Sequence, residues 1–334
     1  ESMRYGVPNI STKVGDADRI IGETGWIVEP RNKSALANAF LEALKLHKKD
    51  KSKWQMLKIN ASKRINENYN IFKMIDSFNN LWSENFQNNQ VTKIFHIISG
   101  LGSGGAQAVL ARLVKNEKKY KHTIISFMDF GIYESYFREI NVKLIKLDME
   151  KGKFSLKGFI KLCKIIKENK PDVIQTWMYH ADFIGGLVGR LYKTKKIFWN
   201  IRNSNLKTEW ASYSTIVISR FCAFLSNLIP TSIISCSKKS KDVHISLGYN
   251  KNKIKVINNG YDTQEMFFIN KKNDKVFKIG MLARWDPQKD YKNLARSLSE
   301  FQKLTNRNWQ LYLAGDRIDE NNHKLTKIFY NSQF

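Results

Sequence analysis

Residues 93–107 read KIFHIISGLGSGGAQ, an apolar run that leads through a glycine-rich turn into a helical pattern. Branched and aromatic side chains in a run of this length are typical of a buried strand. Glycines let the backbone approach an anion closely, and the N–H groups that open the next helix favour negative charge. A tight turn between strand and helix would explain the glycines equally well. The stretch predicts a strand–turn–helix unit with a candidate phosphate loop at Gly104 and Gly105.

Strand and helix patterns alternate from Thr92 onward. The gaps between the strands carry amphipathic patterns, such as Leu156, Phe159 and Cys163 on one side of a helix with lysines on the other. Strict alternation implies βαβ units, a parallel sheet and helices on both of its faces. We therefore predict an α/β fold with a Rossmann-like, doubly wound parallel sheet. The expected strands are 93–99, 123–128, 142–147, 173–178, 196–202, 232–236 and 254–258.

The two ends of the sequence have different patterns. A polar stretch at 270–274 precedes a new strand at 277–282, a helix at 291–304, a strand at 309–314 and a helix from about Asn321, which resemble the opening of a second α/β domain. The first ninety residues contain strands at 9–14 and 25–28 and then three helical patterns, which resemble the closing half of such a domain. The predicted organisation is 1–86, a linker at 87–91, a domain at 92–270 and an incomplete domain at 275–334.

Composition bounds the class of protein. With 334 residues and 42% hydrophobic residues, the chain can build two domains with their own cores. Its three cysteines are scattered, which argues against a disulfide framework or a zinc site and fits the cytoplasm. The most apolar stretch, 216–236, contains Arg220, Asn227 and Pro230, so we expect a helix and a strand there and no membrane span. A first residue of Glu1 and no signal peptide pattern indicate that the sequence begins inside something larger.

The net charge of +26 is uneven, with excesses of +4 in 1–90, +8 in 91–190 and +14 in 191–334. Such a field attracts anionic phospholipid, nucleic acid or sugar-nucleotide phosphates. A lysine-rich solvated surface is the alternative explanation. A nucleic-acid-binding protein is supported by the charge alone, because no recognisable module is present. We therefore expect no nucleic acid partner.

Two further motifs follow expected strands. Residues 284–290 read RWDPQKD, where Arg284 could grip a diphosphate as a fork and Lys289 as a point charge, although a pair of surface cations would look the same. Residues 177–182 read WMYHAD, where His180 could contact a sugar hydroxyl or serve only in the core. Ligands of open α/β sheets collect at the carboxyl ends of the strands, where both motifs are expected.

Together these segments resemble the retaining glycosyltransferases of family 4, which have the GT-B fold of two facing Rossmann-like domains. The residues 1–8, 14–16 and 24–30, which read ESMRYGVP, VGD and TGWIVEP, resemble the carboxyl-terminal third of that family. The other matching strings, in the order of the family, are GSGGAQ at 102–107, WMYHADFIGG at 177–186, NNGYD at 258–262, RWDPQKDYKNL at 284–294 and LAGD at 313–316.

The resemblance implies roles for single residues. Arg284 and Lys289 would hold the diphosphate of the donor, and His180 would lie beside the transferred sugar. Glu1 would be the second glutamate of an E-x7-E pair that binds ribose. The remaining residues implied by the resemblance are Gly104 and Gly105 near the donor, and Asn200, Ile201 and Arg202 on the acceptor side.

The resemblance also implies an activity. A sugar would pass from a UDP- or GDP-sugar to a saccharide or lipid-linked acceptor with retention of configuration, without a metal or another cofactor. The reaction would be a step of bacterial surface polysaccharide synthesis, in the cytoplasm at the inner face of an anionic membrane. A catalytically incomplete fragment of such an enzyme is the alternative.

The order of the segments departs from the family, which runs from acceptor domain to donor domain. A tandem protein clipped at both ends would give this order, and so would a circular permutation in which 1–86 and 275–334 complete one domain. We favour the clipped tandem, because both ends fall inside motifs and Glu1 is no natural start.

Overall fold

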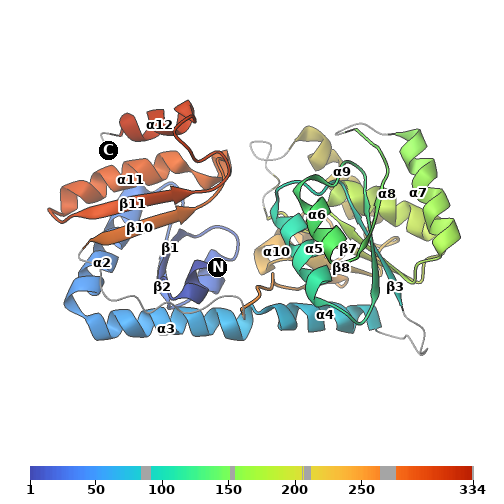
Figure 1. Ribbon diagram of the computed structural model, residues 1–334, viewed down its shortest axis with the longest axis horizontal. Helices are drawn as coiled ribbons and strands as arrows, with labels where there is room; N and C mark the ends of the chain where they lie inside the picture. The colour runs from blue at the N-terminus through green and yellow to red at the C-terminus, as the bar shows by residue number, and fades with distance from the viewer. Residues whose placement is uncertain (84–91, 151–154, 205, 207–211, 264–275, 333–334) are drawn as a thin grey trace. The chain divides into compact units, whose positions relative to one another are not determined.

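The computed structural model describes residues 1–83, 92–150, 155–204, 206, 212–263 and 276–332, in two compact units. Unit 1 combines Glu1–Glu67 with Thr263–Phe334, and unit 2 consists of Asn68–Asp262. The predicted linker at 87–91 and the polar stretch at 270–274 lie outside the described residues. Each unit is an α/β structure with parallel strands (Figure 1).

Unit 2 is built on a parallel seven-stranded sheet with the order β5-β4-β3-β6-β7-β8-β9. The chain winds outward from β3 in one direction and then from β6 in the other, so the switch point of the sheet lies between these two strands. All seven predicted strands are therefore confirmed, as is the doubly wound class. Their bounds are β3 Lys93–Ile98, β4 Lys121–Ser126, β5 Lys143–Lys146, β6 Val173–Trp177, β7 Lys196–Ile201, β8 Ser232–Ser235 and β9 Ile254–Val256.

Helices cover both faces of this sheet (Figure 1). Side chains of α4, α5 and α6 pack on one face, with Phe78 and Leu110 among those that are completely buried. Side chains of α7, α8 and α9 pack on the other face, with Leu162, Val188 and Cys222 in the core. The helices of unit 2 are α4 Ile71–Ser83, α5 Gly105–Asn116, α6 Glu134–Glu139, α7 Leu156–Asn169, α8 Tyr179–Leu191, α9 Tyr213–Leu225 and α10 Lys238–Ser246.

Serine side chains start three of these helices. The hydroxyl groups of Ser155, Ser212 and Ser237 accept hydrogen bonds from the backbone N–H three residues later, at the beginnings of α7, α9 and α10. A cap of this kind satisfies one of the N–H groups that the first turn of a helix leaves without a partner. The helix starts are therefore encoded locally in the sequence.

A chain of hydrogen bonds crosses the core of unit 2. Trp177 Nε1 donates to His96 Nδ1 at 3.3 Å, His96 Nε2 lies 2.9 Å from His122 Nδ1, and His122 Nε2 lies 2.8 Å from a carboxylate oxygen of Glu117. If both rings are neutral and carry their proton on Nε2, every Nε2 has an acceptor for its proton and every Nδ1 has a donor. Burial, and then the neighbouring ring, lower the pKa of His96 well below its ordinary value, which keeps this ring neutral.

Unit 1 has two parallel strand pairs and a core from both ends of the chain. Phe40 on α2 and Phe301 on α11 lie with their ring centroids 5.8 Å apart, and Lys33 forms an ion pair with Glu300 at 2.6 Å. The strands pair as β1 with β2 and β10 with β11. The elements of unit 1 are β1 Asn9–Thr12, α1 Ala17–Ile21, β2 Gly25–Val28, α2 Lys33–Lys49, α3 Lys51–Asn68, β10 Phe277–Leu282, α11 Tyr291–Leu304, β11 Trp309–Ala314 and α12 His323–Tyr330.

The division of the chain differs from the predicted boundaries at 86 and 275. The difference comes from α4, whose buried side chains Phe78, Leu81 and Trp82 belong to the core of the seven-stranded sheet. The two ends of the chain also share one core.

The apolar stretch at 216–236 contains most of α9 and all of β8, as predicted. In the part of the chain that the structure describes, no helix combines the length and the apolar character needed to cross a bilayer.

Candidate functional site

The glycine-rich turn follows β3 and leads directly into α5, where Gly104 is the N-cap residue. A Cβ atom added at Gly102 or Gly105 would meet no other atom within 4 Å, and neither residue has a positive φ. Packing and backbone conformation therefore give no reason for glycine at these two positions. Glycine at such positions allows a ligand to approach the backbone closely. This observation weighs against the simple tight turn.

The turn after β6 carries His180 and a strained residue. Met178 has φ 74° and ψ 156°, a region that residues other than glycine rarely adopt. Its N–H donates to the carbonyl of Asn200 at 3.1 Å, which ties the turn to β7. Burial lowers the pKa of His180 below its ordinary value, so the imidazole is neutral at pH 7. Strain of this kind concentrates at functional sites.

Asp182, in the first turn of α8, is completely buried beneath this turn. Its Oδ1 accepts hydrogen bonds from Thr176 Oγ1 at 2.5 Å and from the backbone N–H of Asn200 at 3.4 Å. Burial raises the pKa of Asp182 to about 7, although these two hydrogen bonds act in the opposite direction. The carboxyl group connects β6, β7 and α8 behind His180.

Several buried polar groups near the carboxyl ends of the strands have no hydrogen-bond partner among the described residues. They include Asp182 Oδ2, Ser99 Oγ and the side-chain amide of Asn200, whose residue has no exposed surface. A buried polar atom without a partner is rare in proteins and often marks a place for water or a ligand.

Arg202 follows β7 and is held at two points. Its Nη1 donates to Asn259 Oδ1 at 2.5 Å, and its guanidinium lies 4.9 Å from the ring centroid of Trp177. Burial lowers the pKa of Arg202 to about 10, which leaves it charged at pH 7. A positive charge therefore lies at this edge of the sheet.

Arg284 and Lys289 belong to unit 1, in the loop after β10. Arg284 donates through Nε and Nη2 to one carboxylate oxygen of Asp286, at 3.1 and 2.9 Å. The other oxygen of Asp286 accepts the N–H of Gln288 at 2.9 Å. Burial raises the pKa of Asp286, but these hydrogen bonds outweigh it and the pKa lies below its ordinary value. The carboxylate fixes Arg284, which is 45% exposed, beside the loop.

The predicted residues thus fall into two sets. Gly104, Gly105, His180, Asn200 and Arg202 all lie at carboxyl ends of strands of unit 2. The set in unit 1 comprises Arg284, Lys289 and Glu1, which is exposed at the start of the 3-10 helix Ser2–Tyr5.

Sequence reasoning assigned no role to two residues that the structure adds, Asp182 and Met178. An aspartate inside the apolar helix that reads YHADFIGGLVGRL was a visible signal for the first. Nothing in the sequence marks the conformation of Met178, whose N–H donates to the carbonyl of Asn200 in β7.

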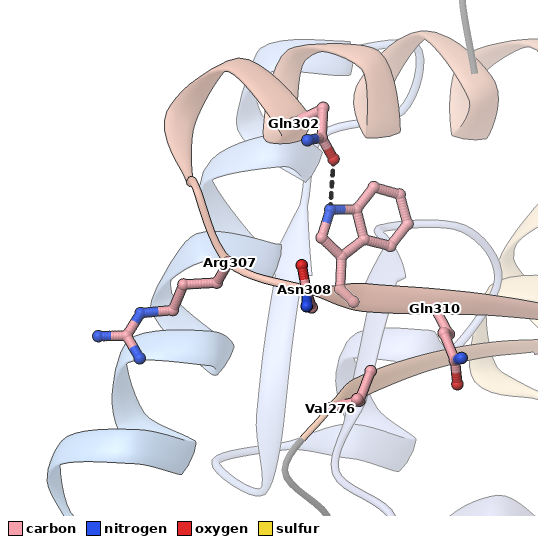
Figure 2. Close-up of a pocket in the computed structure, with 6 residues that line it drawn as sticks. Val276, Gln302, Arg307, Asn308 and Gln310 are labelled. Carbon is pink, nitrogen blue, oxygen red and sulfur yellow. Dashed lines mark hydrogen bonds between the residues drawn. The ribbon is translucent and has the colours of Figure 1, made fainter.

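A hollow lies at the opposite edge of unit 1, at the amino ends of β10 and β11 (Figure 2). Two of its lining residues are joined by a hydrogen bond, which Trp309 Nε1 donates to Gln302 Oε1 at 2.6 Å. Its other lining residues are Val276, Arg307, Asn308 and Gln310. Because ligands of α/β sheets bind at carboxyl ends, this hollow is no candidate for the site. Among the described residues, no group of three or more histidine, cysteine or acidic side chains could hold a metal ion.

Residues 103–265 match the model of Glycosyltransferase Family 4. No curated protein matches the chain. Anabaena Alr3699/HepE in complex with UDP is 18% identical, with a TM-score of 0.58, and covers 72% of this chain and 65% of its own. The same protein with UDP and glucose has a TM-score of 0.56 at the same identity and coverage.

A glycosyltransferase from Rickettsia africae is 15% identical, with a TM-score of 0.53, and covers 74% of this chain and 66% of its own. The chain thus spans about 65% of the length of the Anabaena structures. At these identities the likeness concerns the fold. The chain is therefore an α/β protein with the fold of the GT-B glycosyltransferases, and its residues 103–265 resemble Glycosyltransferase Family 4.

Proposed function

We propose that this chain is part of a retaining glycosyltransferase that moves a sugar from a UDP- or GDP-sugar to a saccharide or lipid-linked acceptor. The family match and the fold support a transferase, and Anabaena Alr3699/HepE binds UDP and UDP-glucose. The proposal includes a role in bacterial surface polysaccharide synthesis and no dependence on a metal. It also includes a location in the cytoplasm at the inner face of the membrane, which the net charge of +26 favours.

One observation carries the proposal. The switch point of the seven-stranded sheet lies between β3 and β6, and the two candidate loops follow these two strands. Ligands of doubly wound sheets bind at this point, because the loops on either side of it turn away to opposite faces. Gly102 and Gly105 lie in the first loop and His180 in the second. Both loops have features that the fold itself does not require, as described above.

The chemistry of the transfer assigns a role to each side chain. As the bond between sugar and phosphate breaks, negative charge builds on the departing oxygen, and fixed positive charge or N–H groups stabilise it. Arg284 and Lys289 would supply that charge, and the backbone at Gly104 and Gly105 would supply N–H groups. The neutral imidazole of His180 would hydrogen-bond the sugar, since it offers one donor and one acceptor. Glu1 would bind ribose.

The acceptor side requires different properties. Arg202 supplies a fixed cation, held by Asn259 and the face of Trp177. Asn200 supplies an amide without a hydrogen-bond partner among the described residues. A guanidinium and an amide suit an acceptor that carries phosphate and hydroxyl groups.

The test is calorimetric titration of the chain with UDP and GDP. Gly105→Val should weaken nucleotide binding about tenfold or more, because its side chain would fill the space that a phosphate would occupy, while its Cβ would meet no protein atom. Arg284→Gln combined with Lys289→Gln should also weaken it about tenfold, because two charge-assisted contacts are lost. Arg307→Gln, an exposed cation at the amino end of β11, is the matched control and should bind as the unchanged chain does.

Equal affinity of all variants for the nucleotide would refute the assigned residues. Binding of neither nucleotide would favour the catalytically incomplete fragment, and turnover of the sugar nucleotide would exclude it. A parallel titration with duplex DNA covers the remaining alternative, because salt-sensitive binding to DNA without binding to UDP or GDP would indicate a nucleic-acid-binding protein.

A further inference from the structure

Large apolar side chains are exposed on two neighbouring helices of unit 2. Phe221 and Phe224 on α9 are 58% and 74% exposed, and Leu228 just beyond α9 is 66% exposed. Leu187 and Leu191 on α8 are 37% and 63% exposed. These five residues are called the α8–α9 face below. Single exposed apolar residues are common on proteins, but a group of this size on two neighbouring helices is characteristic of an interaction surface.

The two helices that carry these side chains pack against each other (Figure 1). Phe221 and Phe224 are three positions apart on α9, and Leu187 and Leu191 are four positions apart on α8, which places each pair on one side of its helix. Arg190 Nε donates to the carbonyl of Ile229 at 2.7 Å and joins the end of α8 to the segment after α9. Leu191 and Leu228 are the chain neighbours of these two residues.

The exposure is not a consequence of poor packing. Between the two phenylalanines, Cys222 and Ala223 are buried and belong to the core with Trp199 and Ile233. The helix therefore has a complete inner side and a separate apolar outer side. Apolar residues on both sides of α9 explain why residues 216–236 are more apolar than the burial of one side would require.

The exposed charged residues on α8 and α9, and just after α8, are all basic. Arg190, Lys193 and Arg220 are exposed on the same two helices or directly after them. In the sequence from 183 to 241, Glu209 is the one acidic residue, and it lies outside the described residues. Apolar aromatic side chains with basic residues beside them are the features that bind an interface of anionic lipids.

We propose that the α8–α9 face docks on an anionic phospholipid bilayer, with Phe221 and Phe224 entering the interface and the basic side chains contacting lipid phosphates. A second copy of the chain is a less favourable occupant, because it carries the same charge of +26. The proposal does not rest on sugar transfer, since its residues are not those assigned to the nucleotide or the sugar. It states which surface of the protein would meet the membrane.

The experiment is sedimentation of the chain with vesicles of phosphatidylcholine alone or with an equal share of phosphatidylglycerol. The unchanged chain should sediment with the anionic vesicles and stay in solution with the neutral ones. Phe221→Ser combined with Phe224→Ser should lower the vesicle partition coefficient about tenfold or more, because two aromatic side chains no longer enter the interface. Arg220→Gln should lower it less, and the difference should vanish at high salt.

Phe72→Ser is the matched control. Phe72 is 49% exposed on α4, which covers the other face of the sheet, so its replacement removes an exposed phenylalanine without touching the α8–α9 face. Binding that is unchanged in the double variant, or lost equally in the control, overturns the proposal. Light scattering provides the other decisive outcome, because a dimer that the double variant dissociates would make this face a contact between copies. Nucleotide titration of the same variants should show no change, which separates this proposal from the proposed function.

Discussion

At the scale of single residues, the site contains a buried carboxyl group with a strongly raised pKa, that of Asp182. It is a buried carboxyl group with one oxygen bonded to Thr176 and to the N–H of Asn200, and with its other oxygen unpartnered among the described residues. Burial disfavours the charged form, which raises the pKa of Asp182 to about 7 from 3.8. A raised pKa means that the folded protein holds this proton more tightly than the unfolded chain does.

The stability contributed by this proton is fully present below about pH 4 and is lost as the pH rises through about 7. We predict that Asp182→Asn removes this loss, because asparagine stays neutral and can still accept from Thr176. Relative to the variant, the unchanged protein should lose on the order of 4 kcal/mol of unfolding free energy between pH 4 and pH 8.

Urea denaturation of both proteins at several pH values measures the difference, and comparison with the variant cancels the opposite dependence of groups such as His96. Parallel pH profiles for the two proteins would show that Asp182 is ionised in the native state across this range.

At the scale of elements, α8 lies close to the sheet because its inner side carries glycines. A Cβ added at Gly186 would lie 2.7 Å from Trp199 Nε1 and 2.8 Å from Ile229 Cγ2, while Gly185 and Gly189 face β3, β6 and β7 in the same way. These contacts position the first turn of α8, with His180 and Asp182, against the ends of β6 and β7. The resemblance found in the string WMYHADFIGG thus includes glycines that serve packing.

We predict that Gly186→Ala lowers the free energy of unfolding by about 1–3 kcal/mol, although alanine is the better helix former, because the added methyl group overlaps with Trp199. Gly105→Ala, at the first residue of α5 with open space around it, should leave stability unchanged or slightly raised. Thermal or urea unfolding of the two variants makes the comparison. Equal effects would mean that α8 can move away from the sheet at little cost.

At the scale of the whole molecule, the core of unit 1 joins segments that are far apart in the sequence. Leu36, Phe40 and Leu44 from the first part pack with Ile279, Leu298 and Phe301 from the last part. The sequence analysis placed these segments in two separate predicted domains. In the structure their side chains form one core. The arrangement has a direct energetic consequence, because side chains in contact do not act independently.

We predict that Phe40→Leu and Phe301→Leu are coupled by about 0.5–1.5 kcal/mol in a double-mutant cycle, since their rings are in contact at 5.8 Å between centroids. Phe40→Leu with Phe137→Leu is the control, because Phe137 is buried in the core of unit 2 and the two effects should add. Denaturant unfolding of the four proteins in each cycle measures the coupling. Additive effects in the first cycle would be evidence that the two ends fold as parts of different modules.

The sequence alone determined the elements and the fold class. Strands such as 277–282 and 309–314 were predicted to the residue, because a short apolar run next to polar or glycine residues is a local signal. It also indicated the loops that carry Gly104, His180 and Arg284. These loops follow the carboxyl ends of strands, where ligands of this fold class bind. The roles of these residues stay predictions.

Only the tertiary structure decided two things. One is which glycines and buried polar groups are not accounted for by packing and hydrogen bonds, and the other is which segments share a core. Open space beside Gly105, the buried carboxyl group of Asp182 and the unpartnered amide of Asn200 depend on neighbours from other strands. The assignment of α4 to unit 2, and the joining of α2 with α11, depend on which apolar faces meet. Periodicity in a sequence shows that a helix has an apolar face, but it does not specify the partner, because burial of apolar surface is favourable against any surface of suitable shape.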